Sequence, residues 1–332
     1  MKVIDMHCDT IAEIFYNQED GGNDGLLKNS FQLDLERMEK GDYAVQNFAL
    51  FTPLGRPRTE NNPFAYGMRL LDMFYNEMEK NKDRISFVKS YQEIEDNMKN
   101  GKMSALLTLE EGGVCMGNIR LLRDFYRLGV RMMTLTWNFP NELGFPAKVT
   151  EGNLKGTLFD GEEYGLTETG IAFIKEMERL GIIIDVSHLN DAGIRDVLKY
   201  TTKPFVASHS NAKKICGHPR NLNDDLIRAI AERGGVIGIN YSSSFLRDWE
   251  EGEEEVSRIE DMVKHVLYIR ELAGIDCIGL GSDFDGIDGE LEIASPEDLP
   301  LLEKALREAG LKESEIEKIF YQNVLRLYKD IL

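Results

Sequence analysis

The feature that most constrains the fold of this chain is a regular alternation of two kinds of segment. Amphipathic stretches with helical periodicity, such as residues 119–128, 167–180 and 191–200, lie between short apolar stretches that end at turn residues. Strand and helix in alternation predict a parallel sheet. The eight short apolar stretches cover about residues 2–6, 43–51, 103–110, 130–136, 181–187, 203–208, 235–240 and 275–281. Eight such strands predict an α/β fold of the (β/α)8 type, a TIM-like barrel.

The length of 332 residues suits a single barrel, so we expect one domain over residues 1–332. Asn190 and Asn223 precede amphipathic stretches and are expected to cap the helices that follow. Residues 138–164 are rich in Gly, Asn and Pro and have no clear period, which predicts a long loop over the end of the barrel.

The charge of the chain excludes some partners. Fifty-eight acidic residues against 39 basic ones give a net charge of −19, which repels phosphate backbones and anionic lipid, so we expect no nucleic acid and no membrane partner. The first residues form an expected strand rather than a signal segment, which favours a cytoplasmic protein. The four cysteines are far apart and predict neither a disulfide framework nor a thiolate metal site.

Residues that bind metals follow several of the expected strands. His7 and Asp9 end the first strand two positions apart, so their side chains lie on the same side of an extended chain. His188 and His209 end two later strands. In a parallel barrel the carboxyl ends of the strands meet at one face, which carries the functional residues. The sequence therefore predicts a metal site there, with the imidazole and carboxylate ligands that zinc prefers.

A glutamate pair could complete this site. Glu110 and Glu111 end the third strand, and because neighbouring residues of a strand face opposite sides, only one of them can point inward. The inward carboxylate could bridge one ion held by His7 and Asp9 and a second held by His188 and His209. Two such ions would share a water, lower its pKa and polarise a substrate carbonyl, as hydrolysis of an amide requires.

Three further residues are assigned from their positions. Asp283 follows the last strand and could move a proton from the metal-bound water to the leaving amine. Arg220 lies in the loop after the sixth strand, where its guanidinium could pair with a substrate carboxylate. His265 belongs to an amphipathic stretch and is expected at the surface or an interface.

Six short motifs in this order resemble the renal (membrane) dipeptidases, peptidase family M19. The motifs are His-x-Asp at 7–9, Glu-Gly-Gly at 111–113, Asp-Val-Ser-His at 185–188, Ser-His-Ser at 208–210, Arg-Asn at 220–221 and Ser-Asp-Phe-Asp-Gly at 282–286. The resemblance spans nearly the whole chain and implies a barrel with two zinc ions. It also implies that Glu111 bridges the ions, that Asp283 lies beside the bridging water or hydroxide, and that Arg220 binds the terminal carboxylate of the substrate.

The chain departs from the family in one place. Members commonly have a substrate-binding histidine after the fourth strand, whereas this chain has Trp137 and Asn138 there. Asn138 or Asn141 could donate to the substrate instead, and we take Asn138 as the candidate.

The resulting hypothesis is a zinc-dependent dipeptidase, a dinuclear metallo-hydrolase of small unblocked dipeptides. The missing histidine keeps open an alternative, a related amidohydrolase acting on another small amide, lactam or ester. A barrel that binds a metal or another ligand without catalysis is the third alternative, and it would be expected to lack the bridge or Asp283. A homodimer is expected from the general frequency of symmetric dimers.

Overall fold

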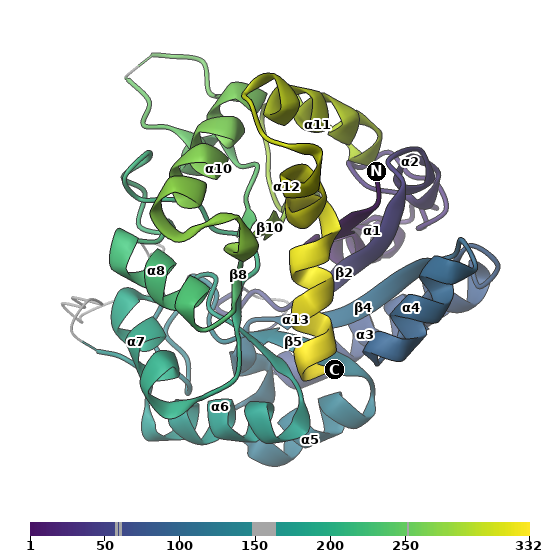
Figure 1. Ribbon diagram of the computed structural model, residues 1–332. Coiled ribbons are helices and arrows are strands. Elements are labelled where there is room, and N and C mark those ends of the chain that lie inside the picture. The colour runs from purple at the N-terminus through teal and green to yellow at the C-terminus, as the bar shows by residue number, and fades with distance from the viewer. Residues whose placement is uncertain (57–58, 60–61, 148–163, 251) are drawn as a thin grey trace.

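The computed structural model confirms the (β/α)8 barrel. It describes residues 1–56, 59, 62–147, 164–250 and 252–332. The expected loop therefore falls partly outside the described residues, at positions 148–163. Figure 1 shows the strands at the centre of the molecule and the helices around them. The barrel strands are β1 (Val3–Asp5), β2 (Tyr43–Phe51), β4 (Met103–Glu110), β5 (Val130–Thr134), β6 (Ile183–Asp185), β7 (Val206–Ala207), β8 (Val236–Ile239) and β10 (Ile278–Leu280).

All neighbouring strands of the barrel are parallel, and the pairing of β2 with β4 closes the ring. Glu110 at the end of β4 is level with Phe51 of β2 and with Thr134 of β5, which is in turn level with Asp185 of β6. This register brings the carboxyl ends of the strands to one face, as the sequence predicts. Side chains that follow these strand ends can therefore meet although they are far apart in the chain.

One strand of the sheet was not expected from the sequence. Strand β3 (Ile85–Val88) pairs with the first half of β4, whose second half pairs with β5, so β3 extends the sheet outside the ring. A two-stranded sheet of β9 (Val256–Ser257) and β11 (Glu290–Leu291) lies apart from the barrel sheet.

Amphipathic helices cover the barrel, and side-chain caps begin many of them. The caps expected at Asn190 and Asn223 are present, since their side chains accept from the backbone N–H of Gly193 and Leu226. The α-helices are α1 (Thr10–Glu19), α2 (Leu35–Lys40), α3 (Pro63–Lys80), α4 (Tyr91–Lys99), α5 (Ile119–Arg127), α6 (Glu168–Leu180), α7 (Asp191–Tyr200), α8 (Asp224–Glu232), α9 (Ser243–Leu246), α10 (Ile259–Ala273), α11 (Leu299–Glu308), α12 (Glu313–Glu317) and α13 (Asn323–Ile331). The other helical segments are the 3₁₀ helices η1 (Gly112–Cys115), η2 (Ile275–Cys277) and η3 (Pro296–Asp298) and the π-helix η4 (Lys318–Gln322).

The C-terminal helix closes the end of the barrel opposite the polar strand ends. Figure 1 shows α13 lying across this end. Its residues Val324, Leu327 and Tyr328 join a buried cluster with inward side chains of the strands, and the Tyr328 hydroxyl donates to Asn47 Oδ1 at 2.7 Å. The barrel is therefore a packed core with an apolar cluster at this end, and the pocket lies at its other end.

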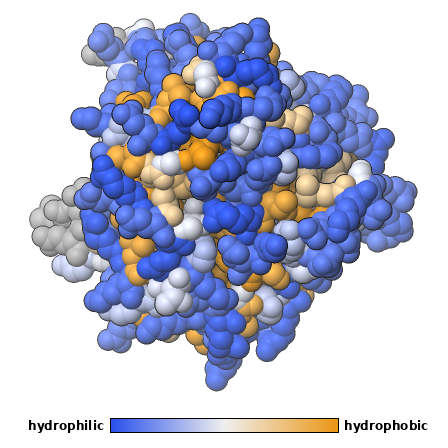
Figure 2. Space-filling view, in the orientation of Figure 1, coloured by the Kyte–Doolittle hydropathy of each residue, from blue (hydrophilic) through white to orange (hydrophobic). Residues whose placement is uncertain are grey.

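One face of the molecule can be compared with the helices that form it. The face in Figure 2 is largely hydrophilic, with apolar side chains visible in small patches between helices. Within the described residues, the helices are all too short or too polar to cross a lipid bilayer.

His265 lies inside the protein, so the expectation of a surface position is wrong. The side chain is 0% exposed on α10, and it connects the segment at Ala212 to the end of α9. Its Nδ1 accepts from the backbone N–H of Ala212 at 3.1 Å, and its Nε2 lies 2.9 Å from the carbonyl oxygen of Leu246. Both ring nitrogens are satisfied when the imidazole is neutral, and burial lowers the pKa of His265 to about 4.

Because His265 is buried as a neutral imidazole, we expect the protein to lose stability in mild acid. An unfolded histidine titrates near pH 6.5, so between about pH 6.5 and pH 4 the unfolded chain binds a proton that the folded chain excludes. The free energy of unfolding should fall through this window by up to about 1.4 kcal/mol per pH unit from this group. Urea titrations of the wild type and His265→Gln at several pH values isolate the contribution. Parallel pH profiles of the two proteins would contradict it.

Candidate active site

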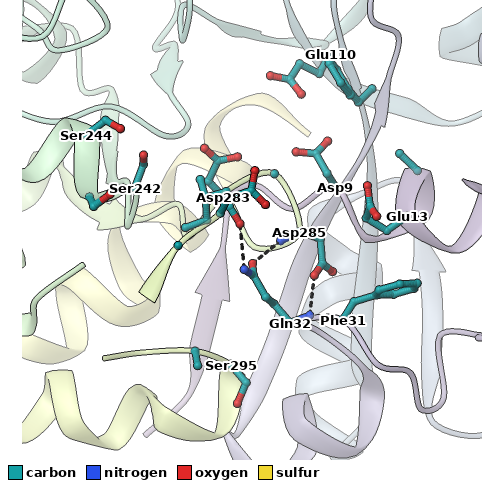
Figure 3. A pocket seen from close by; sticks show the side chains of 18 of the residues that line it. Asp9, Glu13, Phe31, Gln32, Glu110, Ser242, Ser244, Asp283, Asp285 and Ser295 are labelled. Atoms are coloured by element: carbon teal, nitrogen blue, oxygen red, sulfur yellow. Dashed lines mark hydrogen bonds between the residues drawn. The ribbon is translucent and has the colours of Figure 1, made fainter. Parts of the chain in front are cut away.

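The open end of the barrel contains a large pocket. Its volume is about 1190 Å³, and the residues that line it include Asp9, Glu110, Trp137, His188 and Asp283. In Figure 3 the carboxylates of Asp9, Glu110 and Asp283 lie around a common space. Each of these residues lies at the end of a barrel strand or in the short segment that follows it, so the ring of strands brings them together.

Two buried aspartates hold the strand ends that carry the histidines. Asp5 Oδ1 accepts from the backbone N–H of His7 at 3.2 Å and of Ser282 at 3.0 Å, which ties the end of β1 to the end of β10. Asp185 Oδ1 does the same for the ends of β6 and β7, since it accepts from the backbone N–H of Ser187 at 3.0 Å and of Ser208 at 2.9 Å. These bonds orient the segments that carry His7, Asp283, His188 and His209.

Glu110 occupies the centre of the site. Its Oε1 lies 3.1 Å from His188 Nε2 and 3.8 Å from His209 Nε2, and its Oε2 lies 3.5 Å from His7 Nε2. Three overlapping sets of side chains have donor atoms close enough to share an ion, and Glu110 belongs to two of them. The sets are His7, Asp9 and Glu110; Glu110, His188 and His209; and His7, His209 and Asp283.

The expectation that Glu111 faces this site is wrong. Glu111 follows the last residue of β4 at a φ of 88°, in the left-handed region, so the chain turns away there. Its carboxylate accepts from the backbone N–H of Gly113 at 2.7 Å, from that of Trp137 at 2.8 Å, and from Asn141 Nδ2. Glu110 is the inward residue of the pair, and Glu111 holds the loops behind it.

The histidine pair shows that the residues fit a metal ion. His188 Nδ1 lies 3.0 Å from Asn138 Oδ1, and His209 Nδ1 lies 2.7 Å from Ser208 Oγ. With a proton on each Nδ1, the two Nε2 atoms carry lone pairs that face each other at 3.0 Å and also face Glu110. Lone pairs in that arrangement repel unless a cation lies between them.

The other side of the site also lacks partners for its polar atoms. Both ring nitrogens of His7 and Asp9 Oδ1 are buried without a hydrogen-bond partner within the described part of the chain. Buried polar atoms are normally satisfied, so these atoms point to a missing group. Gly286 leaves the space open, because a Cβ there would lie 2.3 Å from Asp9 Oδ2 and 2.6 Å from Asp283 Oδ1.

The electrostatics of the site favour a cation. Burial raises the pKa of Glu110 to about 8, with repulsion from Asp9 adding to it, and burial raises the pKa of Asp283 to about 6. Burial by itself would lower the pKa of His7, but the carboxylates of Glu110 and Asp9 outweigh it and raise that pKa well above its ordinary value. Excess negative charge in a dry pocket is the condition that divalent metal ions relieve.

The pKa values of His188 and His209 shift in the opposite direction to that of His7. Burial, aided by the positive charge of Arg220, lowers the pKa of both His188 and His209 well below the ordinary value. Neutral imidazole is the form that binds metal ions. The site therefore combines acceptor carboxylates on one side with neutral imidazoles on the other.

The structure places the remaining candidates around this centre. Asp283 Oδ1 lies 3.7 Å from His7 Nε2, and its Oδ2 accepts from Asn240 Nδ2 at 2.9 Å. Arg220 is 3% exposed and donates to the carbonyl oxygen of His209 at 3.2 Å, while its Nε has no hydrogen-bond partner in the described structure. Asn138 lines the pocket, but its side-chain oxygen is directed at His188.

Sequence reasoning missed the supporting residues Asp5, Asp185 and Asn240. A signal for the first two exists, because each aspartate ends a strand and accepts from the N–H of the residue two positions later, a common local motif. Asn240 makes the same local contact, since its Oδ1 accepts from the backbone N–H of Ser242 at 2.6 Å, but no local signal indicates its bond to Asp283, 43 positions away.

A parallel barrel with paired histidines and carboxylates at the carboxyl ends of its strands defines the class of metal-dependent hydrolases. Comparison with known proteins agrees with that class. The family model described as membrane dipeptidase (peptidase family M19) matches residues 1–331. The chain belongs to this family.

Individual relatives support the same placement. The chain is 35% identical over 248 residues to an uncharacterized protein from the pqqA 5′ region of Klebsiella pneumoniae, covering 75% of this chain and 89% of that protein. It is 31% identical over 306 residues to an uncharacterized dipeptidase of Schizosaccharomyces pombe, covering 89% and 71% of the two chains.

Solved structures of the family superpose over the whole chain. A dipeptidase described as a family M19 metallopeptidase has a TM-score of 0.88 at 29% identity, covering 100% of this chain and 98% of the other. A metallopeptidase from Rhodobacter sphaeroides, bound to a phosphinate mimic of the dipeptide L-Ala-D-Ala, has a TM-score of 0.87 at 26% identity, covering 100% and 99%.

Replacing Glu110 and replacing Glu111 should have different effects on metal binding. Glu110→Gln removes a carboxylate between the ligand pairs and should weaken metal binding by about 100-fold or more, beyond the 10–100-fold typical of outer partners of a metal site. Glu111→Gln should keep the metal but lower the free energy of unfolding by about 1–3 kcal/mol, because an amide cannot accept all three of its hydrogen bonds. Metal analysis after dialysis and urea denaturation give the two readouts. Metal loss in the Glu111 variant alone would reverse the assignment.

Proposed function

We propose that this protein is a dinuclear zinc dipeptidase that hydrolyses small unblocked dipeptides. The observation that carries the proposal is the position of Glu110 between two ligand pairs, with Asp283 beside them. The family supports dipeptidase activity in general. The metallopeptidase with a bound dipeptide mimic supports a small peptide as the substrate.

The residues divide between two metal positions. His7 and Asp9 would hold one ion, His188 and His209 the other, and Glu110 would bridge them. The donor set consists of imidazole nitrogens and carboxylate oxygens without a thiolate, which suits zinc. When bound, two such ions polarise the substrate carbonyl and lower the pKa of a water that they share.

Asp283 has the surroundings of a proton carrier. Burial raises the pKa of its carboxyl group, and the group lines the pocket beside the candidate metal ligands, where it could reach an attacking water. Asn240 holds Oδ2, which leaves Oδ1 toward His7 and the metal ligands. The carboxylate could then take a proton from the attacking water and deliver it to the leaving amine.

Arg220 supplies a buried positive charge that interacts with Asp283 and Glu110 of the acidic centre. Its guanidinium stacks 5.4 Å from the ring of Phe245, which lines the pocket, and its Nε is free to donate. A buried guanidinium is well suited to a substrate carboxylate, since the pair forms away from water. A free carboxylate on the residue that follows the scissile bond is the feature that would distinguish a free dipeptide from one blocked at its carboxyl end.

A related amidohydrolase that cleaves another small amide, lactam or ester is the second candidate. The observation behind it is the loop at Trp137 and Asn138, where family members commonly have a histidine. Here Trp137 packs against Phe51 and Phe139, and Asn138 lines the pocket with its side-chain oxygen directed at His188. Asn138 as a substrate donor, the cytoplasmic location and the homodimer remain proposals from the sequence.

The proposed role of Asp283 predicts a separation of metal binding from turnover. The zinc-loaded protein should release amino acids from free dipeptides, in a screen that includes L,L and L,D stereoisomers. Asp283→Asn should keep both metal ions and the melting temperature but lower kcat by about two to four orders of magnitude, the usual size of general acid–base catalysis. Near-normal turnover by the metal-loaded variant would remove Asp283 from the mechanism. Cleavage of esters or lactams without any dipeptide cleavage would favour the second candidate.

The proposed role of Arg220 predicts two losses that do not add. Arg220→Met should raise KM for free dipeptides, and a carboxyl-amidated dipeptide should already be a poor substrate of the wild type. Both changes remove the same charge-assisted pair, worth about 1.5–3 kcal/mol, so their combination should cost little more than either one. Arg247→Met, at a surface arginine paired with Glu253, serves as the control. Fully additive losses would show that Arg220 does not contact the carboxylate.

A further inference from the structure

A chain of hydrogen bonds behind His209 connects this histidine to a buried carboxylate. The hydroxyl of Ser208 lies 2.7 Å from His209 Nδ1 and 2.5 Å from Asp185 Oδ2. All three side chains are 0% exposed, and none of them lies in the lining of the pocket. The mechanism proposed above does not use Ser208 or Asp185 as a contact of the substrate.

The position of each proton in this chain follows from the partners. Asp185 accepts from four donors, namely the backbone N–H of Ser187 and of Ser208 at Oδ1, and the hydroxyls of Thr134 and Ser208 at Oδ2. A carboxylate with four donors has no proton to give. The hydroxyl hydrogen of Ser208 is therefore directed at Asp185, because two lone pairs at 2.5 Å would repel strongly.

The hydroxyl oxygen of Ser208 can then only accept from its other neighbours. Ser187 Oγ accepts from the backbone N–H of His209 at 3.0 Å, which leaves its own hydrogen free to point at Ser208 Oγ, 3.3 Å away. The second lone pair of Ser208 Oγ faces His209 Nδ1 and requires a proton on that nitrogen.

We infer that Ser208, anchored on Asp185, is a positioning residue that fixes His209 as the Nδ1–H tautomer and so keeps the lone pair of Nε2 directed at the metal position. The inference rests on the metal site of the proposed function. Hydrogen bonds from the second nitrogen of a metal-binding histidine generally set its tautomer and orientation. Here the carboxylate acts through a serine instead of directly.

The other two histidines of the site are supported differently. His188 Nδ1 contacts the side-chain oxygen of Asn138, which belongs to the loop after β5 rather than to a strand end. His7 Nδ1 has no partner in the described structure. His209 is thus the one of these three histidines whose ring proton is set by a buried charge, and we expect it to be the most strictly oriented.

Nuclear magnetic resonance of the protein labelled with ¹⁵N-histidine tests the inference. The chain has five histidines, and His209→Gln identifies the signal of His209. Two-bond nitrogen–proton couplings, recorded on metal-stripped protein at a pH where the ring is neutral, report which nitrogen carries the proton. The metal is removed because a bound ion would impose the tautomer by itself.

Two variants should change the tautomer in different ways. Ser208→Ala removes the acceptor and should give a mixture of tautomers. In Asp185→Asn the side-chain oxygen should stay with the two backbone N–H groups, so the new NH₂ faces Ser208 Oγ and donates to it. The serine hydrogen is then released toward His209 Nδ1, and His209 should become mainly the Nε2–H tautomer. Thr134→Val removes another donor to Asp185 and should leave His209 unchanged, as the matched control.

A second measurement uses zinc-loaded protein, so it also tests a variant that unfolds when its metal is removed. Competition with a chelator on the zinc-loaded proteins should show 10- to 100-fold weaker retention in Ser208→Ala and Asp185→Asn, the usual effect of losing an outer partner, and no change in Thr134→Val. An unchanged Nδ1–H signal in both variants, or equal zinc retention in all four proteins, would overturn the inference.

These outcomes are separate from those of the proposed function. A tautomer that responds as described in a protein without dipeptidase activity would remove the proposed substrate and leave the positioning role intact. If the protein is an active dipeptidase but the tautomer of His209 is unchanged by both substitutions, the proposed function stands and the positioning role is removed.

Discussion

The burial of three carboxylates around one histidine is the constraint on which the site depends. Asp9, Glu110 and Asp283 all have oxygens within 3.7 Å of His7 Nε2, and all are less than one-tenth exposed. Burying unpaired charge is expensive, and proteins tolerate it where a cation or a functional task compensates. The raised pKa values of Glu110 and Asp283 express this cost in the structure without metal. In a dinuclear centre, the attraction between the same carboxylates and the metal ions would stabilise metal binding.

The scaffold around the site is built to hold that charge in place. Asp5 and Asp185 make the same kind of contact on opposite parts of the ring. Each carboxylate accepts backbone N–H groups from the end of its own strand and from the end of the neighbouring strand. Strained backbone conformations occur close to these hydrogen bonds. His188 and Asp283 have φ values of 68° and 65°, in the left-handed region that residues other than glycine rarely adopt. Such conformations persist where the surrounding hydrogen bonds over-determine the backbone, which agrees with a site that is organised before ligands arrive.

Much of the fold could be predicted because its signals are local. Each barrel strand is a short apolar run, and the helix caps at Asn190 and Asn223 are single residues beside their helices. Strand β3 escaped prediction because it pairs outside the ring and is only partly buried. His265 was misplaced for a related reason. Its helix is amphipathic, but its partners are the backbone of Ala212 and of Leu246 at the end of α9, and no local pattern connects these residues to His265.

The sequence by itself determined the alternation of strand and helix, and hence the barrel, and it determined that His7, Asp9, His188 and His209 would follow strand ends at one face. Those features depend on side-chain periodicity and on the parallel direction of the strands. Only the tertiary structure decided between Glu110 and Glu111. The alternation of a strand requires that one of them face inward, but the choice depends on the residue at which β4 stops. The chain turns at Glu111, whose carboxylate finds N–H donors from Gly113 and Trp137, and this leaves Glu110 to the histidines.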